Sequence, residues 1–126
     1  MTQAEKWVIK VGSSLVSGNQ DGINENFISK LASQIDFLKK KDQEIIIISS
    51  GAIAKGMNDL GFKQRPDNLA ILQACAAVGQ RGIAEIYQRT FRNLGYMTGQ
   101  VLITHDDIAN RERYLNAKNT LEALLE

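Results

Sequence analysis

The stretch Trp7-Val8-Ile9-Lys10-Val11-Gly12-Ser13-Ser14 organises the rest of the chain. Its first half is apolar and β-branched, which is typical of a strand buried on both faces of a parallel sheet. Lys10 interrupts this run just before it ends. Because an unpaired ammonium group is costly to bury, Lys10 should be neutral, paired or aimed at an anion.

The residues after this strand favour a phosphate-binding bend. Gly12 predicts a turn that a bulky residue could not make, with backbone N–H groups of the following serines pointing outward. A cation at the carboxyl end of a strand, beside such a turn, is suited to phosphate. Taken alone, the same residues also fit a lysine at a solvated strand edge, so both interpretations stay open at this point.

Composition bounds the class of protein. The chain has 126 residues, 44% of them hydrophobic, which fits one soluble globular unit. Fifteen basic residues against 14 acidic ones give a net charge of +1, which argues against a nucleic-acid or membrane-surface protein. No apolar run approaches the roughly 20 residues that span a bilayer, so we expect no membrane association.

The N-terminus and the cysteine content indicate a cytoplasmic protein. Residues 1–6 lack the charged-then-apolar build of a signal peptide. Cys75 is the one cysteine, which excludes an internal disulfide and fits a reducing compartment. Because Cys75 lies among alanines, we expect a small buried core residue rather than a nucleophile.

Strand and helix patterns alternate along the chain. Further strands are predicted at Glu44–Ser49 and at 98–103, and helical patterns lie between and after them. This order predicts an α/β fold, a three-layer αβα sandwich with a mainly parallel sheet. Three strands make a thin sheet. We therefore expect residues 1–126 to be the N-terminal part of a larger domain, cut near its middle.

Cap residues predict where the two longer central helices begin. Asn24 should cap the first of them after a polar loop at 17–22, and Asp67 should cap the second. The first helix carries a stripe of Ile28, Leu31, Ile35 and Leu38, and the second carries Leu69, Leu72, Ala76, Gly79, Ile83 and Ile86. The small residues of the second stripe, together with Gly82, predict close packing on the sheet.

A second anion-suited bend follows the second strand at Ser50-Gly51-Ala52. A strand-to-helix turn of this kind offers free N–H groups and a helix dipole to a carboxylate or phosphate. Ser50 could equally be a plain helix cap. Two such bends on neighbouring strands favour a site in which one holds the phosphates of a donor and the other an anionic acceptor. The chain has neither GxxxxGK[ST] nor GxGxxG.

Four blocks of the sequence, in order, resemble the glutamate 5-kinases, a branch of the amino acid kinase family. The blocks are Lys10 to Ser14, Ile48 to Gly56, Leu72 to Gln80 and Arg113 to Leu121. The resemblance implies transfer of the γ-phosphoryl group of ATP to the side-chain carboxylate of L-glutamate, the first step of proline biosynthesis. It further implies Mg²⁺ as cofactor, a homo-oligomer, proline as a feedback inhibitor and, in many bacterial members, a C-terminal RNA-binding-like (PUA) domain.

The resemblance also implies that residues 1–126 form the glutamate-site and phosphate-loop part of the domain, with the nucleotide-binding half absent, and it implies roles for particular residues. Lys10 would contact the ATP phosphates and act as the catalytic residue, with Gly12 and Ser13 supplying the phosphate-facing turn. Glutamate would be held by Ser50, Gly51 and Ala52. No residue is assigned to a metal, and the helix of Tyr114 to Thr120 would shape the glutamate side. His105 is expected to be a turn residue without a catalytic role.

Other functions are compatible with parts of this sequence pattern. The kinase half of a bifunctional pyrroline-carboxylate synthase, or a carbamate or acetylglutamate kinase, would share most of these blocks. A non-catalytic binding or assembly module could use the same half-fold, although the intact Lys10 and glycine turn argue against it. A serine hydrolase built on Ser50 is disfavoured, because GxSxG and evident triad partners are absent.

Overall fold

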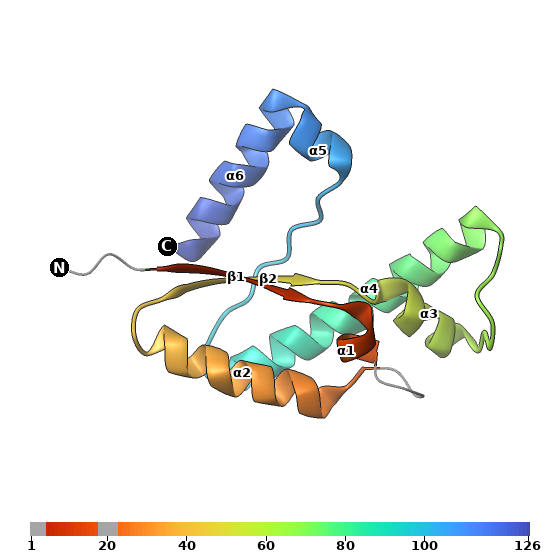
Figure 1. Ribbon diagram of the computed structural model, residues 1–126, viewed down its shortest axis with the longest axis horizontal. Coiled ribbons are helices and arrows are strands. Elements are labelled where there is room, and N and C mark those ends of the chain that lie inside the picture. Colours follow the sequence, from red (N-terminus) through yellow and green to blue (C-terminus); the bar gives the residue numbers. More distant parts are fainter. Residues whose placement is uncertain (1–4, 18–22) are drawn as a thin grey trace.

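The computed structural model describes residues 5–17 and 23–126. Two strands and six helices are assigned in these residues, and strands and helices alternate through the first half of the chain (Figure 1). Most of the polar loop predicted at 17–22 lies outside the described residues. The elements are β1 (Lys6–Val11), α1 (Ser13–Ser17), α2 (Glu25–Lys39), β2 (Glu44–Ser49), α3 (Ala52–Leu60), α4 (Leu69–Asn93), α5 (His105–Ala109) and α6 (Arg111–Leu125).

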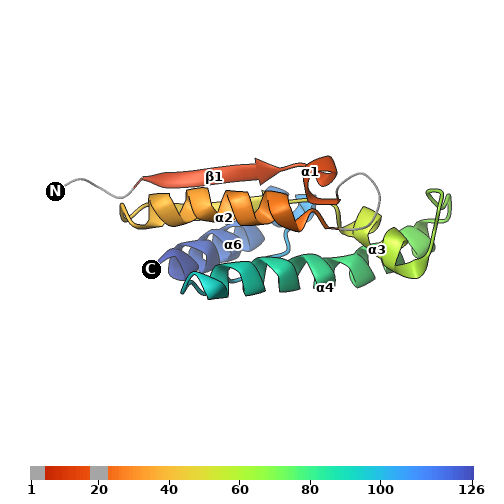
Figure 2. The ribbon, with the colours of Figure 1, turned by 90° about the horizontal axis from the view of Figure 1, so that it is seen from below.

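The two strands form a parallel pair, as the sequence predicts. The register runs from Lys6 opposite Glu44 to Val11 opposite Ser49, so both strands end at the same edge. Helix α2 provides the crossover between them and lies along one face of the pair with α4 (Figures 1 and 2). The α/β class is therefore confirmed, whereas the complete three-layer sandwich stays a prediction.

The core lies between this covered face of the sheet and the two long helices. One cluster joins Val11 and Val16 to Ile83 of α4, with Ile9 and Ile47 packed against it. A second cluster, farther from the carboxyl ends of the strands, is formed by Ala32 and Ile35 of α2 and Phe91 of α4. The packing therefore fixes the strand ends between α1 and α4.

The prediction that both strands are buried on both faces is wrong. Side chains alternate along a strand, and only the set that contains Ile9 and Val11 faces the helices. On the other face, Val8 is 62% exposed and Ile48 is 51% exposed. Figure 1 shows α6 on this side of the strands, but α6 packs mainly against α5. We call this side the open face of the sheet.

The strand predicted at 98–103 is absent, because residues 96–104 run as an irregular connection between α4 and α5. The residues are apolar enough for a strand, yet Leu102 is 72% exposed and no strand edge pairs with the segment. A strand needs a neighbouring edge to satisfy its backbone groups, and local sequence alone does not provide one.

The two predicted helix starts have different outcomes. Asn24 caps α2 as predicted, with its Oδ1 atom accepting from the amide of Phe27 at 3.1 Å, and Ile28 is fully buried. The cap of α4 is Asn68 rather than Asp67, and its Oδ1 accepts from the amide of Ile71 at 3.2 Å. Asn and Asp are comparable caps, so the sequence pattern could not separate adjacent candidates.

The small residues of α4 do allow a close approach, but chiefly to α3 rather than to the sheet. A Cβ atom added to Gly79 would collide with the carbonyl oxygen of Ala52, and one added to Gly56 would collide with that of Cys75. The stripe predicted on α4 is also wrong at its first residue, because Leu69 is 69% exposed. Cys75 is fully buried, as predicted.

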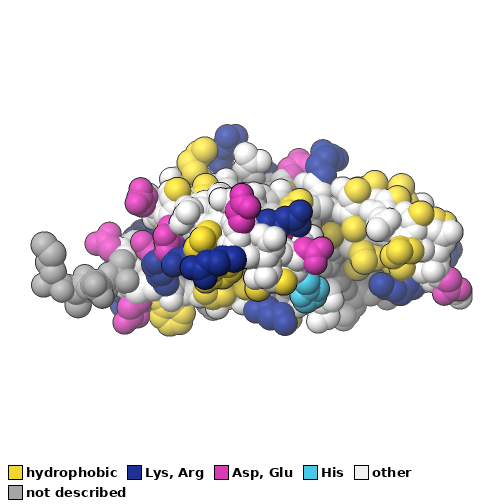
Figure 3. Space-filling view, turned by 90° about the horizontal axis from the view of Figure 1, so that it is seen from above, with side chains coloured by type: hydrophobic (Ala, Val, Ile, Leu, Met, Phe, Trp, Pro, Cys, Tyr) yellow, Lys and Arg dark blue, Asp and Glu magenta, His cyan; other side chains and the backbone are white. Residues whose placement is uncertain are grey.

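Helices α5 and α6 form a separate corner on the open side of the sheet. No residue of α6 is buried, and its Leu124 is 52% exposed. Figure 3 shows exposed apolar side chains among charged ones on this side, and a further group over the α3–α4 end of the molecule. Among the described residues, no helix combines the length and apolar character of a membrane span.

Candidate functional site

The two predicted anion-suited bends lie in direct contact at the carboxyl edge of the sheet. Ser50 follows β2, and its backbone N–H donates to the carbonyl oxygen of Val11, the last residue of β1, at 3.2 Å. The hydroxyl of Ser50 donates to the same carbonyl at 3.3 Å. These bonds extend the pairing of the strands by one residue and hold the two bends together.

Gly51 is the residue that makes this contact possible. It has φ +107°, a left-handed conformation that glycine adopts without strain, and it lies against the first turn of α1. A Cβ atom at this position would lie 3.5 Å from the Cα atom of Ser13 and 3.6 Å from the Cβ atom of Val16. The backbone conformation, more than lack of space, therefore requires glycine here.

Gly12 differs from the prediction made for it. It has no positive φ, and an added Cβ would meet nothing within 4 Å, so the turn itself does not require glycine. Its carbonyl oxygen accepts from the amides of Leu15 and Val16 at 3.2 and 3.3 Å and starts α1. Ser13, the first residue of that helix, is exposed. The space beside Gly12 is thus open to a ligand approaching the backbone.

Lys10 lies next to these bends on the open face of the sheet. It pairs in register with Ile48 and is exposed, whereas its neighbours Ile9 and Val11 face the core. The alternation of side chains along β1 therefore places the ammonium group on the solvent side, directly before the bend. A positive charge in this position is available to an anion bound across the strand ends.

Helix α3 begins at Ala52 with its first amides directed toward the strand ends. Its N-cap is Gly51, which has no side chain to satisfy them. The N-terminal end of a helix carries partial positive charge and favours anions. Contact between Ala52 and Gly79 of α4 fixes this first turn from behind. The arrangement can therefore hold a carboxylate or phosphate group through backbone N–H groups.

The end of β2 is also joined to α4 by a side-chain hydrogen bond that the sequence pattern did not predict. The hydroxyls of Ser49 and Tyr87 are 3.0 Å apart. Burial raises the pKa of the Tyr87 phenol, and the hydrogen bond with Ser49 offsets part of that effect. Tyr87 lies two helical turns after Gly79. A tyrosine on an apolar helix face was the signal that could have indicated a hydrogen-bond partner for its hydroxyl.

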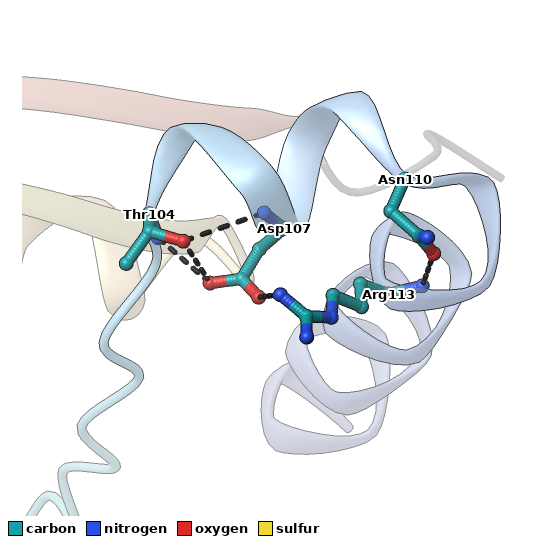
Figure 4. Close-up of polar contacts among 4 residues, drawn as sticks. All are labelled: Thr104, Asp107, Asn110 and Arg113. Atoms are coloured by element: carbon teal, nitrogen blue, oxygen red, sulfur yellow. Dashed lines mark hydrogen bonds and ion pairs between the residues drawn. The ribbon is translucent and has the colours of Figure 1, made fainter.

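Residues 113–121, the last of the four blocks that resemble the glutamate 5-kinases, lie apart from the bends, in the α5–α6 corner. Figure 4 shows Thr104 and Asp107 in a reciprocal capping box and Asn110 capping α6 through the amide of Arg113. Hydrogen bonds from the Thr104 backbone and hydroxyl hold the pKa of Asp107 below its usual range. Tyr114 is 45% exposed and His105 is exposed at the start of α5.

Comparison with known proteins places the chain in a kinase family. Residues 5–126 match the amino acid kinase family, and the chain belongs to it. Curated relatives named glutamate 5-kinase resemble this chain along nearly its whole length. They include proteins of Janthinobacterium sp. (51% identity, covering 98% of this chain and 33% of the relative), Cupriavidus taiwanensis (49%, 99% and 34%) and Hydrogenovibrio crunogenus (45%, 98% and 33%). The chain thus spans about a third of the length of the curated relatives it matches.

Proposed function

We propose that this chain is the N-terminal part of an enzyme that transfers the γ-phosphoryl group of ATP to the side-chain carboxylate of L-glutamate, the first step of proline biosynthesis. The observation that carries the proposal is the contact between the two bends: Ser50 bonded to Val11, and Gly51 packed on Ser13. Two anionic reactants bound at adjoining bends would lie side by side, as a direct transfer requires.

The residue types suit this reaction. The side chain of glutamate has a pKa of about 4.3, so it is ionised at neutral pH and needs no general base. The carboxylate oxygen would attack the γ-phosphorus while the bond to the β–γ bridging oxygen breaks and ADP leaves. Phosphoryl transfer of this kind depends mainly on positioning and on cancelling negative charge. Glycines, serines and a lysine can supply both.

We assign the glutamate carboxylate to Ser50 and the backbone of Gly51 and Ala52, at the N-terminus of α3. Lys10, Gly12 and Ser13 would face the phosphates of ATP, with the Lys10 ammonium group stabilising charge in the transition state. The described residues contain no group of three or more His, Cys, Asp and Glu side chains placed to hold a metal ion. We assign Mg²⁺ to the ATP substrate, whose phosphates bind it, and no step relies on a metal held by these residues.

The complete domain would form the three-layer αβα sandwich, with a further part of the protein holding the nucleotide base. Because the chain spans about a third of its relatives' length, we expect residues 1–126 alone to be inactive. A homo-oligomer, inhibition by proline and a cytoplasmic location belong to the same proposal. The sequence following residue 126 would distinguish this enzyme from a bifunctional pyrroline-carboxylate synthase.

Substitution of Lys10 tests the assignment in the whole protein. We expect Lys10→Ala to reduce turnover roughly 100-fold, the effect of losing one preorganised charge-stabilising group. The fold should be unchanged because Lys10 is exposed. Trapping of γ-glutamyl phosphate with hydroxylamine measures the reaction. Lys6→Ala, at the other end of β1, is the matched control, and near-normal turnover of Lys10→Ala would remove Lys10 from its role.

A further inference from the structure

Four consecutive residues at the end of β2 are each fixed by a different neighbour. Ser49 bonds to Tyr87 of α4, and Ser50 bonds to Val11 of β1. Gly51 packs on α1, and Ala52 packs on Gly79 of α4. Three of these contacts involve backbone atoms of residues 50–52. The contact of Ser49 is the only one of the four made through a side chain on each partner, so a point substitution can remove it without deleting any of the three backbone contacts.

Tyr87 is itself held rigidly. Its ring packs against both core clusters, and it stacks on Phe91 with a centroid separation of 6.5 Å and an interplanar angle of 10°. The ring therefore has little freedom to follow Ser49 if the strand end moves. A phenol is protonated at neutral pH, and burial raises the pKa of Tyr87 further, so its hydroxyl is available to donate. A fixed hydroxyl of this kind can define where a neighbouring strand ends.

We propose that Tyr87 is a positioning residue for the bend at Ser50–Ala52, acting through its hydrogen bond with Ser49. Because Ser49 directs its side chain toward α4, the backbone turns away at Ser50 and presents the N-terminus of α3 to the strand edge. Loss of the bond would let the end of β2 rotate and would loosen this bend. Under the proposed function, on which this inference rests, the bend binds the carboxylate acceptor.

Lys10 and Gly12 would be much less affected, since Lys10 belongs to β1, Gly12 lies between β1 and α1, and neither contributes to the Ser49–Tyr87 bond. The proposal therefore predicts an effect on one substrate only. A residue that merely stabilises the fold would instead lower stability without separating the two substrates. This asymmetry distinguishes a positioning role from a general structural one.

The test is steady-state kinetics of the Tyr87→Phe variant of the whole protein, with hydroxylamine trapping as the assay. Phe keeps the ring and removes only the hydroxyl. We expect KM for glutamate to rise about two- to tenfold, the range that one hydrogen bond supplies, with KM for ATP and kcat within about twofold of wild type. Ser49→Ala should have the same effect, and the double variant should be no worse than either single one.

Two further variants serve as controls. Ser49→Thr keeps a hydroxyl and should retain most of the wild-type affinity for glutamate. Tyr96→Phe removes a different phenol bond, the one that Tyr96 donates to Asp36 at 2.7 Å, near the C-terminal end of α2. It should lower stability to a comparable extent and leave both KM values unchanged.

Three results would overturn the proposal: an unchanged KM for glutamate in Tyr87→Phe, a parallel rise of both KM values, or additive effects of Tyr87→Phe and Ser49→Ala. If the wild-type protein does not phosphorylate glutamate, the proposed function fails and amide hydrogen exchange decides the positioning role. The Ser50 amide, bonded to Val11, should then exchange faster in Tyr87→Phe than in Tyr96→Phe. Equal exchange rates would refute it.

Discussion

The α3–α4 pair and the α5–α6 corner are both built from helices with apolar stripes, but they end up in different environments. In the first pair, Gly56 and Gly79 let the two backbones touch, and Cys75 is fully buried at the junction. In the corner, no residue of α6 is buried and Leu124 of its apolar face is 52% exposed. Yet α6 and α4 have the same kind of N-terminal cap, an Asn side chain that accepts a hydrogen bond from a backbone amide of the first turn.

This difference separates two conditions that are often taken together. A helix forms where caps and local spacing favour it, and both regions satisfy that condition. Burial requires in addition a complementary surface, which α3 provides for α4 and which α5, the main neighbour of α6, provides only in part. The stability of the two regions against unfolding should therefore respond differently to the same kinds of substitution.

The largest expected effect is on the α3–α4 junction. In Gly79→Ala the added methyl group would overlap the carbonyl oxygen of Ala52, so the two helices must separate. We expect the free energy of unfolding to fall by more than about 4 kcal/mol. Urea unfolding followed by circular dichroism measures it. Gly82→Ala is the control on the same helix, because its methyl group would meet only the flexible end of Lys55. A similar loss in both variants would contradict the backbone contact.

Next in size is the contrast between the covered and open faces. Ile28 of α2 is fully buried, whereas Ile48 of β2 is 51% exposed on the open face. We expect Ile28→Ala to cost about 3 kcal/mol through a cavity and Ile48→Ala less than about 1 kcal/mol. The same denaturation experiment compares them. Comparable losses would mean that the open face is covered in solution.

The elements with strong local signals were the ones that the sequence predicted well. The alternation of strands and helices, the cap at Asn24 and the buried Cys75 all follow from residue type and spacing. The strand at 98–103 failed because pairing depends on a distant edge, which no local pattern encodes. For the same reason, burial of β1 and β2 on both faces was inferred from composition, although Val8 and Ile48 on the open face are more than half exposed.

In the candidate site, the sequence indicated both bends but not how they meet. The bonds from Ser50 to Val11 depend on strand register, and the packing of Gly51 on Ser13 depends on where α1 lies. The partnership of Ser49 with Tyr87 joins residues 38 positions apart. Such contacts follow from three-dimensional packing, so residue type alone could suggest candidates without pairing them.

A smaller effect is expected from removing the same cap in the two regions. Asn68 caps α4 and Asn110 caps α6 through equivalent bonds of 3.2 and 3.1 Å. Each Asn→Ala substitution should cost about 1 kcal/mol. In α4 the loss should appear in global unfolding, because that helix is part of the core. In α6 it should appear only as faster local amide hydrogen exchange. A global loss from Asn110→Ala would show that the corner is more strongly coupled to the core.

The smallest expected effect is the pH dependence conferred by two aspartates, Asp36 in α2 and Asp107 in the α5–α6 corner. A hydrogen bond from Lys40, with a second from Tyr96, holds the pKa of Asp36 below its usual value, and the Thr104 cap does the same for Asp107. A lowered folded-state pKa gives stability that is fully present above the unfolded value of about 3.9 and is lost as pH falls through the folded pKa.

Asp36→Asn should therefore lower Tm at neutral pH, and its difference from wild type should shrink in acid. Because the bond from Tyr96 connects Asp36 of α2 to the segment after α4, that change should be global, whereas Asp107→Asn should reduce only the helicity of the corner. A Tm difference for Asp36→Asn that persists unchanged in acid would show that the carboxylate charge is not what stabilises this contact.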